Sequence, residues 1–101
     1  MIEIAIVEDE ENYRNILQEY LQKYEQEYRE QIHLSVYTDG DEITENYSAK
    51  YDIIFMDIEM QFMDGMTAAR KIREADKGVI IIFITNMAQY AIQGYEVDAL
   101  D

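Results

Sequence analysis

The sequence predicts an α/β fold, in which helices cover both faces of a doubly wound parallel sheet. Three short apolar runs rich in β-branched residues, at 4–7, 53–56 and 79–84, are typical of interior strands that are covered on both faces. Residues 32–36 instead alternate apolar and polar side chains, which favours an edge strand. Because helical patterns separate the runs, we expect parallel strands joined by right-handed crossovers.

Four helices are expected between and after these strands. Apolar residues recur every three or four positions over 13–28, which predicts a helix with one apolar stripe. Many of them are tyrosines, which are expected as core or as amphipathic cover. Asp39, with Glu42 three residues later, indicates an acidic capping box and a short second helix. Asp64 is a candidate N-cap for a third helix, and residues 87–94 have the pattern of a fourth.

Length and composition favour one small cytoplasmic domain. A chain of 101 residues with 49% hydrophobic residues supports a single core over residues 1–101, and no apolar run approaches the ~20 residues that span a bilayer. The first residues include Glu3 and lack a basic leader, so a signal peptide is not expected. Without cysteine, thiolate chemistry is excluded. The one histidine, His33, is expected to face solvent without a role.

The charge of the chain is strongly acidic. A formal net charge of −14 predicts that this region repels nucleic acid phosphates, so it is not expected to contact nucleic acid directly. Most of the carboxylates are expected on the solvated surface, and a few could converge on a cation.

Four polar residues stand where predicted strands end. Glu8 and Asp9 follow the first strand, Asp57 ends the third and Thr85 ends the fourth. Each alone is typical of a helix cap or a strand-end hydroxyl, but the carboxyl ends of parallel strands meet in one crevice. Close carboxylates repel by as much as ~4 kcal/mol per pair at an effective dielectric near 20, so the cluster needs a cation. Oxygen ligands without imidazole or thiolate favour partly hydrated Mg²⁺.

Three stretches also resemble a known family. The segments IAIVEDEE, YDIIFMDIEMQFMDGMTAARKIRE and IIIFITN resemble, in order and separation, the signature regions of response-regulator receiver domains. The ending FITNMAQYAIQGYEVDALD resembles the branch whose receivers precede a LytTR-type DNA-binding domain. The resemblance implies a flavodoxin-like receiver fold with strand order 2-1-3-4-5. Its fifth strand and last helix would fall beyond Asp101, so the domain is expected to be incomplete at its C-terminus.

The resemblance also implies a role for each strand-end residue. Asp57 would be the phosphoacceptor, and Asp9 and Asp57 would ligate Mg²⁺ directly. The backbone carbonyl of Glu59 would be a third ligand, and Glu8 would act through water. Thr85 would be the switch hydroxyl that moves towards the phosphoryl group. The lysine that receivers use would lie beyond Asp101, and a proline common in the loop is replaced by Gln61.

By this resemblance, the chain takes a phosphoryl group from a sensor histidine kinase and switches a downstream DNA-binding domain of the LytTR type. It would assist its own phosphoryl transfer and hydrolysis without being a turnover enzyme. The domain could also form a homodimer, and no membrane partner is expected.

Two other functions are alternatives for this sequence. A haloacid-dehalogenase-type enzyme would need a second Asp two residues after the phosphorylated one, where Glu59 stands, and its downstream lysine and acidic motifs are not evident. A receiver-like interaction module that works without phosphorylation is the alternative function. The intact set of Glu8, Asp9, Asp57 and Thr85 argues against it.

Overall fold

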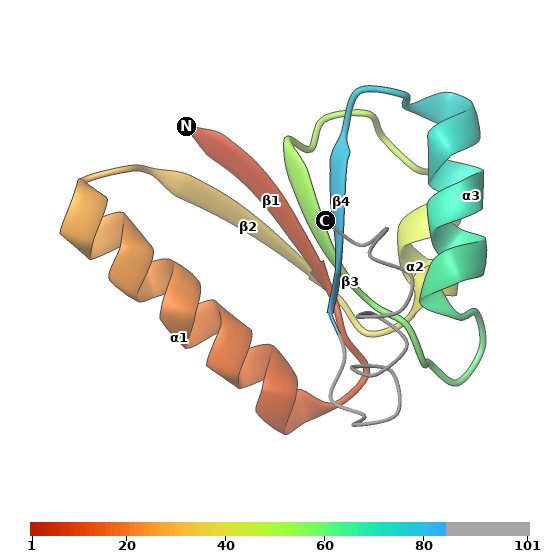
Figure 1. Ribbon diagram of the computed structural model, residues 1–101, viewed down its shortest axis with the longest axis horizontal. Coiled ribbons are helices and arrows are strands. Elements are labelled where there is room, and N and C mark those ends of the chain that lie inside the picture. The colour runs from red at the N-terminus through yellow and green to blue at the C-terminus, as the bar shows by residue number, and fades with distance from the viewer. Residues whose placement is uncertain (85–101) are drawn as a thin grey trace, which may run out of the picture.

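The computed structural model describes residues 1–84, and in that part strands and helices alternate as predicted. The four strands are parallel and lie in the order β2-β1-β3-β4 (Figure 1). This order agrees with the flavodoxin-like arrangement that the family resemblance implied. The elements are β1 (Ile2–Val7), α1 (Glu11–Tyr28), β2 (Ile32–Tyr37), α2 (Gly40–Thr44), β3 (Ile53–Asp57), α3 (Gly65–Ala75) and β4 (Ile80–Ile84).

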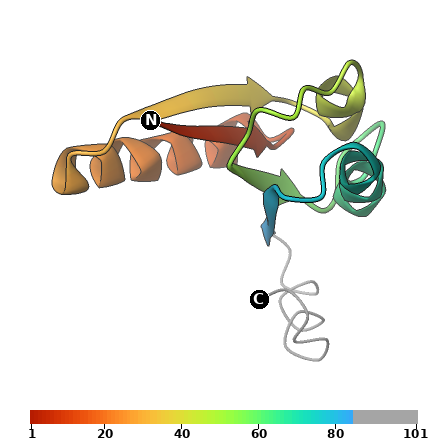
Figure 2. The ribbon, with the colours of Figure 1, turned by 90° about the horizontal axis from the view of Figure 1, so that it is seen from above.

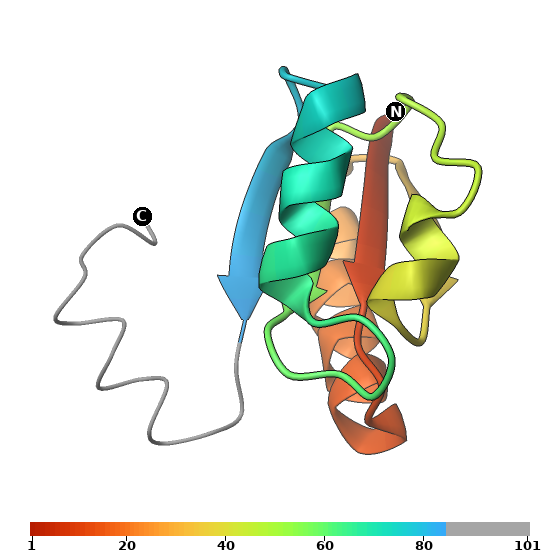
Figure 3. The same cartoon turned by 90° about the vertical axis from the view of Figure 1, so that its right-hand side faces the viewer.

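Helices lie on both faces of the sheet, as expected for a doubly wound fold. Figure 3 shows α2 and α3 on the near face and α1 on the far face, and Figure 2 shows α2 and α3 side by side. The main core lies between the sheet and the α2–α3 pair. It contains buried side chains from both layers: Ala5, Val7, Ile43, Tyr51, Ile54, Met56, Ala68, Ile72 and Val79.

Helix α1 confirms the periodic pattern, and its tyrosines are amphipathic cover rather than core. The helix ends at Arg29, whose backbone is left-handed with φ 54 and whose N–H bonds to the carbonyl of Glu25. None of its residues is fully buried, and Tyr20 and Tyr28 are 65% and 59% exposed. The tyrosine stripe therefore covers the core only in part. Within residues 1–84, no helix is both long and apolar enough to cross a membrane.

The predicted caps of α2 and α3 are present. Asp39 accepts a hydrogen bond from the N–H of Asp41, and Asp64 accepts one from the N–H of Thr67. The predicted capping box is wrong in one respect, because the Glu42 carboxylate does not accept a hydrogen bond from the N–H of the N-cap residue, Asp39. It accepts hydrogen bonds from the N–H and the Oγ1 of Thr38, one residue earlier, each at 2.7 Å.

The two outer strands differ from each other. Strand β2 is an edge strand, as its alternating pattern predicted. The apolar run of β4 is typical of an interior strand, but the fifth strand was expected beyond Asp101, and among residues 1–84 β4 pairs only with β3. Ile81 and Phe83 pack against the core, while Ile80 and Ile82 on the other face are 55% and 37% exposed, because α1 lies too far across the sheet to cover them. Thr85 and the predicted helix over 87–94 lie outside the described residues.

Candidate metal and phosphorylation site

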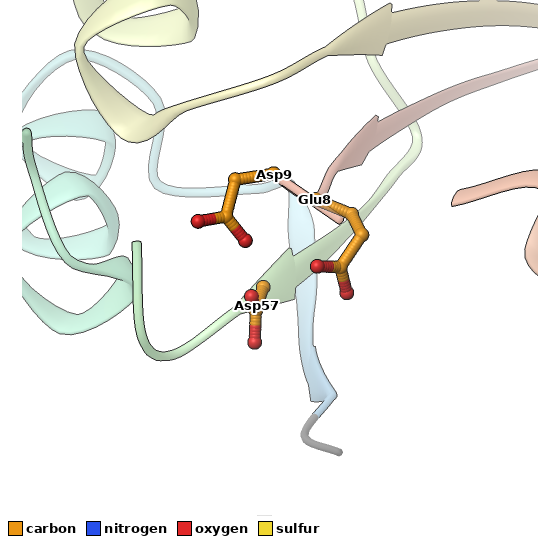
Figure 4. Close-up of side chains that lie close together, drawn as sticks. All are labelled: Glu8, Asp9 and Asp57. Atoms are coloured by element: carbon orange, nitrogen blue, oxygen red, sulfur yellow. The ribbon is translucent and has the colours of Figure 1, made fainter. Parts of the chain in front are cut away.

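The carboxylates predicted to share a crevice do meet. Strands β1 and β3 pair in parallel with Val7 opposite Met56, so the residues that follow, Glu8 and Asp57, end the two strands side by side. Figure 4 shows the side chains of Glu8, Asp9 and Asp57 projecting from these strand ends into one space. One carboxylate oxygen from each residue lies within 4.8 Å of the others. The predicted grouping of these three residues is therefore confirmed.

Glu8 is the most deeply placed member of the cluster. Its side chain is fully buried, and its Oε2 accepts a hydrogen bond of 3.1 Å from the N–H of Glu10. Its own N–H bonds to the carbonyl of Tyr37, and its carbonyl accepts a bond of 2.9 Å from Nη1 of Arg14. These contacts hold the residue at the junction of β1, β2 and the first turn of α1. A buried carboxylate with this many constraints has little freedom to move away from Asp57.

Asp57 is electrostatically strained by its surroundings. It is only 6% exposed. Burial, the charge of Glu8, a side-chain hydrogen bond with Glu8 and the charge of Asp9 together raise the pKa of Asp57 from 3.8 to about 8, against a smaller opposing effect of the Ile58 N–H. A hydrogen bond between two carboxyl groups requires that one of them carries a proton. Three oxygen donors that repel one another in this way fit a hard divalent cation.

The loop after Asp57 turns back sharply towards α3. The N–H of Gly65 bonds to the carbonyl of Ile58 at 2.8 Å. A Cβ at position 65 would lie 2.0 Å from the carbonyl oxygen of Asp57, so any side chain there would push the backbone of Asp57 aside. Gly65 is thus required by this close approach, and the loop of residues 58–64 has a defined course beside the carboxylates.

An open cleft of about 490 Å³ gives access to the site. Asp57 lies on its wall together with Glu59, whose backbone carbonyl was predicted to be a metal ligand. The periodic pattern had assigned Tyr13 only to the helix stripe, yet this side chain also borders the cleft, because it lies on the first turn of α1 just after Asp9. The cleft is lined by Asp9, Glu10, Tyr13, Asp57, Glu59, Met60 and Gln61.

Comparisons with known proteins agree with this arrangement. The family model of the response regulator receiver domain matches residues 4–101. The chain is 35% identical over 103 residues to the sensory transduction protein LytT of Oceanobacillus iheyensis, covering 99% of this chain and 40% of that protein. It is 35% identical to the transcriptional regulatory protein ResD of Bacillus subtilis, covering 92% of this chain and 37% of that protein. The chain thus spans about two fifths of the length of these relatives.

A solved structure extends the comparison to the fold. The response regulator TrrA of Thermotoga maritima, in complex with Mg²⁺-BeF, matches with a TM-score of 0.74 and 31% identity over 89% of this chain and 74% of that chain. LytT proteins of Bacillus cereus and Bacillus anthracis are also among the relatives, at 31% and 32% identity, in line with the predicted branch. This chain belongs to the response regulator receiver domains of two-component systems, and its relatives include the LytT-type regulators.

Proposed function

We propose that this receiver domain accepts a phosphoryl group on Asp57 from the phosphohistidine of a sensor histidine kinase. The observation that carries the proposal is the convergence of Glu8, Asp9 and Asp57 within 4.8 Å beside an open cleft. Phosphoryl transfer needs a positioned nucleophile and positive charge around the moving oxygens more than it needs a general acid or base. A carboxylate in a cation-binding cluster meets both needs.

Mg²⁺ is the cation that this donor set favours. Asp9 and Asp57 would hold it directly, the backbone carbonyl of Glu59 would add a ligand, and Glu8 would act through water. When bound, Mg²⁺ supplies the positive charge that keeps the carboxylates ionised and offsets the charge on the phosphoryl oxygens. The Mg²⁺-BeF complex of TrrA, which is 31% identical, supports this assignment.

The transfer itself uses one oxygen of Asp57 as the nucleophile. The oxygen forms a bond to phosphorus while the bond from phosphorus to the donor imidazole nitrogen breaks, and the nitrogen keeps the electron pair. The other ring nitrogen of the imidazole carries a proton, so the products are an acyl phosphate on Asp57 and a neutral histidine on the kinase. The domain is proposed to take part in this step and in the later hydrolysis without being a turnover enzyme.

The output is proposed to lie in another part of the protein. LytT and ResD are about two and a half times as long as the region they share with this chain, which leaves room for a further domain. The proposed output is a DNA-binding domain of the LytTR type, in keeping with the LytT relatives. A net charge of −14 makes this region a poor partner for nucleic acid. Thr85 is proposed as the switch hydroxyl that responds to phosphorylation.

Labelling with acetyl phosphate, and with a cognate kinase, tests the proposal. It is done on the 101-residue chain and on any longer natural form of it. We expect a hydroxylamine-labile label that Asp57→Asn removes, because an amide is a poor nucleophile. Asp64→Asn is the matched control, since asparagine is as good an N-cap as aspartate and the label should persist. Full labelling of Asp57→Asn would show that another residue is the acceptor.

A further inference from the structure

We propose that Asp39 is a positioning residue for the phosphorylation site. It holds the β3–α3 loop, residues 58–64, against the first turn of α2, and so fixes the course of the chain that carries Glu59 past the metal-binding carboxylates. The inference rests on the proposed function, because it concerns the geometry of that same site. Asp39 itself would touch neither the metal nor the phosphoryl group.

The hydrogen bonds of Asp39 reach across the sequence. Its Oδ1 accepts a bond of 2.9 Å from the N–H of Met63, and its Oδ2 accepts one of 3.0 Å from the N–H of Phe62. Oδ1 also accepts a bond of 3.3 Å from the N–H of Asp41 in α2. One carboxylate therefore ties together two segments that are more than twenty residues apart.

The capping of α2 alone does not explain this arrangement. The bond to Asp41 is the longest of the three, and α2 has only five residues. Asp39 is 4% exposed, a depth that a surface cap does not need. Burial acts to raise the pKa of Asp39, but the backbone N–H groups of Phe62, Met63, Asp41 and Gly40 together outweigh it and hold that pKa below its ordinary value. The residue thus remains a charged acceptor for the loop.

The side chains of Met60 and Met63 also pack against the core, whereas Asp39 holds the loop through its backbone N–H groups. The side chain of Phe62 is 74% exposed, so its apolar surface does little to hold the backbone down. Gly40, the next residue after Asp39, also fits the loop closely. A Cβ at position 40 would lie 2.6 Å from the carbonyl oxygen of Met63 and 3.1 Å from the Cβ of Ala68. Two consecutive residues at the start of α2 are therefore matched to the loop backbone.

Asp39 lies close enough to the site for this contact to matter. A second cleft of about 230 Å³ is lined by both Asp9 and Asp39, with Gln61 and Phe62 of the loop among its other residues. The bond from the N–H of Gly65 to the carbonyl of Ile58 closes the base of the loop, and Asp39 binds the successive N–H groups of Phe62 and Met63. In the sequence, the first attachment is at Ile58 and the next at Phe62. Glu59 lies between these two attachments.

The variant Asp39→Ser separates the capping of α2 from the attachment of the β3–α3 loop. Serine keeps an oxygen that caps α2, but its shorter side chain does not reach the loop. We expect the dissociation constant for Mg²⁺, measured by isothermal titration calorimetry, to rise about tenfold, as for other groups that orient metal ligands. The matched control is Tyr47→Phe, which removes the 2.7 Å bond from the Tyr47 hydroxyl to Asp76 at the far end of α2 and α3. Tyr47→Phe should lower the melting temperature and leave the dissociation constant for Mg²⁺ within about twofold of the wild-type value.

Each outcome decides the proposal. A lower melting temperature in Asp39→Ser with Mg²⁺ affinity unchanged would overturn it, since the role would then be structural only. If that variant does not fold, Asp39→Asn decides, because its amide keeps one oxygen but presents an NH₂ group to the N–H of Phe62. Affinity should then fall severalfold, and wild-type affinity would overturn the inference. Absence of Mg²⁺ binding by the wild type would instead overturn the metal site, and this inference with it.

Discussion

Replacing Asp57 by asparagine should make the metal-free domain more stable, although it removes the proposed phosphoacceptor. The substitution keeps the shape of the side chain and replaces one of three carboxyl groups, whose oxygens lie within 4.8 Å of one another, by a neutral amide. Its amide can also donate a hydrogen bond to the Glu8 carboxylate without needing a shared proton. The carboxylates that would bind a cation are thus expected to make the metal-free wild-type domain less stable.

The size of the effect follows from the pKa of Asp57. Because burial and Glu8 raise this pKa from 3.8 to about 8, the folded protein binds the proton more tightly than the unfolded chain. The resulting stability is fully present below about pH 4 and is lost as the pH rises to about 8, at roughly 1.4 kcal/mol per pH unit, which sets a ceiling near ~6 kcal/mol. One pair of like charges at this separation costs about 3.5 kcal/mol at an effective dielectric near 20. At about pH 8 we therefore expect Asp57→Asn to raise the free energy of unfolding of the metal-free domain by about 3 kcal/mol.

Thermal melting in EDTA between pH 4 and pH 9 measures this difference. The two proteins should be similar at pH 4, and at pH 8 Asp57→Asn should melt at least about 10 °C higher, given about 4–8 °C per kcal/mol for a domain of this size. Mg²⁺ at ten times its dissociation constant should return about 1.4 kcal/mol to the wild type and much less to the variant. If the difference in melting temperature between the two proteins stayed constant from pH 4 to pH 9, the assigned electrostatics would be refuted.

Two further substitutions test the site. Gly65→Ala should destabilise the fold by about 3 kcal/mol or more, because its Cβ would lie 2.0 Å from the Asp57 carbonyl oxygen. The control is Gly78→Ala, whose new Cβ would have no atom within 4 Å, and its stability should be close to that of the wild type in the same denaturant titration. Asp9→Asn should leave the metal-free melting temperature nearly unchanged or slightly raised, because this side chain is exposed, and should abolish the rise with millimolar Mg²⁺. A wild-type Mg²⁺ response in Asp9→Asn would remove this residue from the ligand set.

The order of the elements and the shared carboxylate site could be predicted because both follow from short-range patterns. Apolar runs of strand length and a helical period over 13–28 place each element to within a few residues. Parallel strands then bring the residues after β1 and β3 to one edge of the sheet, whatever the details of packing. The grouping of Glu8, Asp9 and Asp57 needed no knowledge of tertiary contacts beyond strand direction.

Burial was predicted less well, because it depends on what lies across from each side chain. The stripe over 13–28 indicates which residues share a helix face but not how far the helix sits from the sheet centre. Helix α1 lies over β1 and β2, so part of its tyrosine flank stays exposed. Ile80 and Ile82 are as apolar as Ile81 and Phe83, and only the position of α1 and α3 makes one face of β4 exposed and the other half-buried.

Asp39 shows why a local signal can hide a long-range role. An aspartate followed by Gly and two acidic residues is a sufficient N-cap, so the sequence offers no reason to look further. The two shorter bonds of its carboxylate go to N–H groups of Phe62 and Met63, and backbone N–H groups are present at every position except proline, so no residue type in the loop marks the contact. The glycine at position 40 was the one available hint, since a helix interior without a required close approach favours alanine over glycine by about 1 kcal/mol. A glycine just inside a cap is thus a hint that another backbone packs against that turn, and in this domain it is the loop beside the carboxylate cluster.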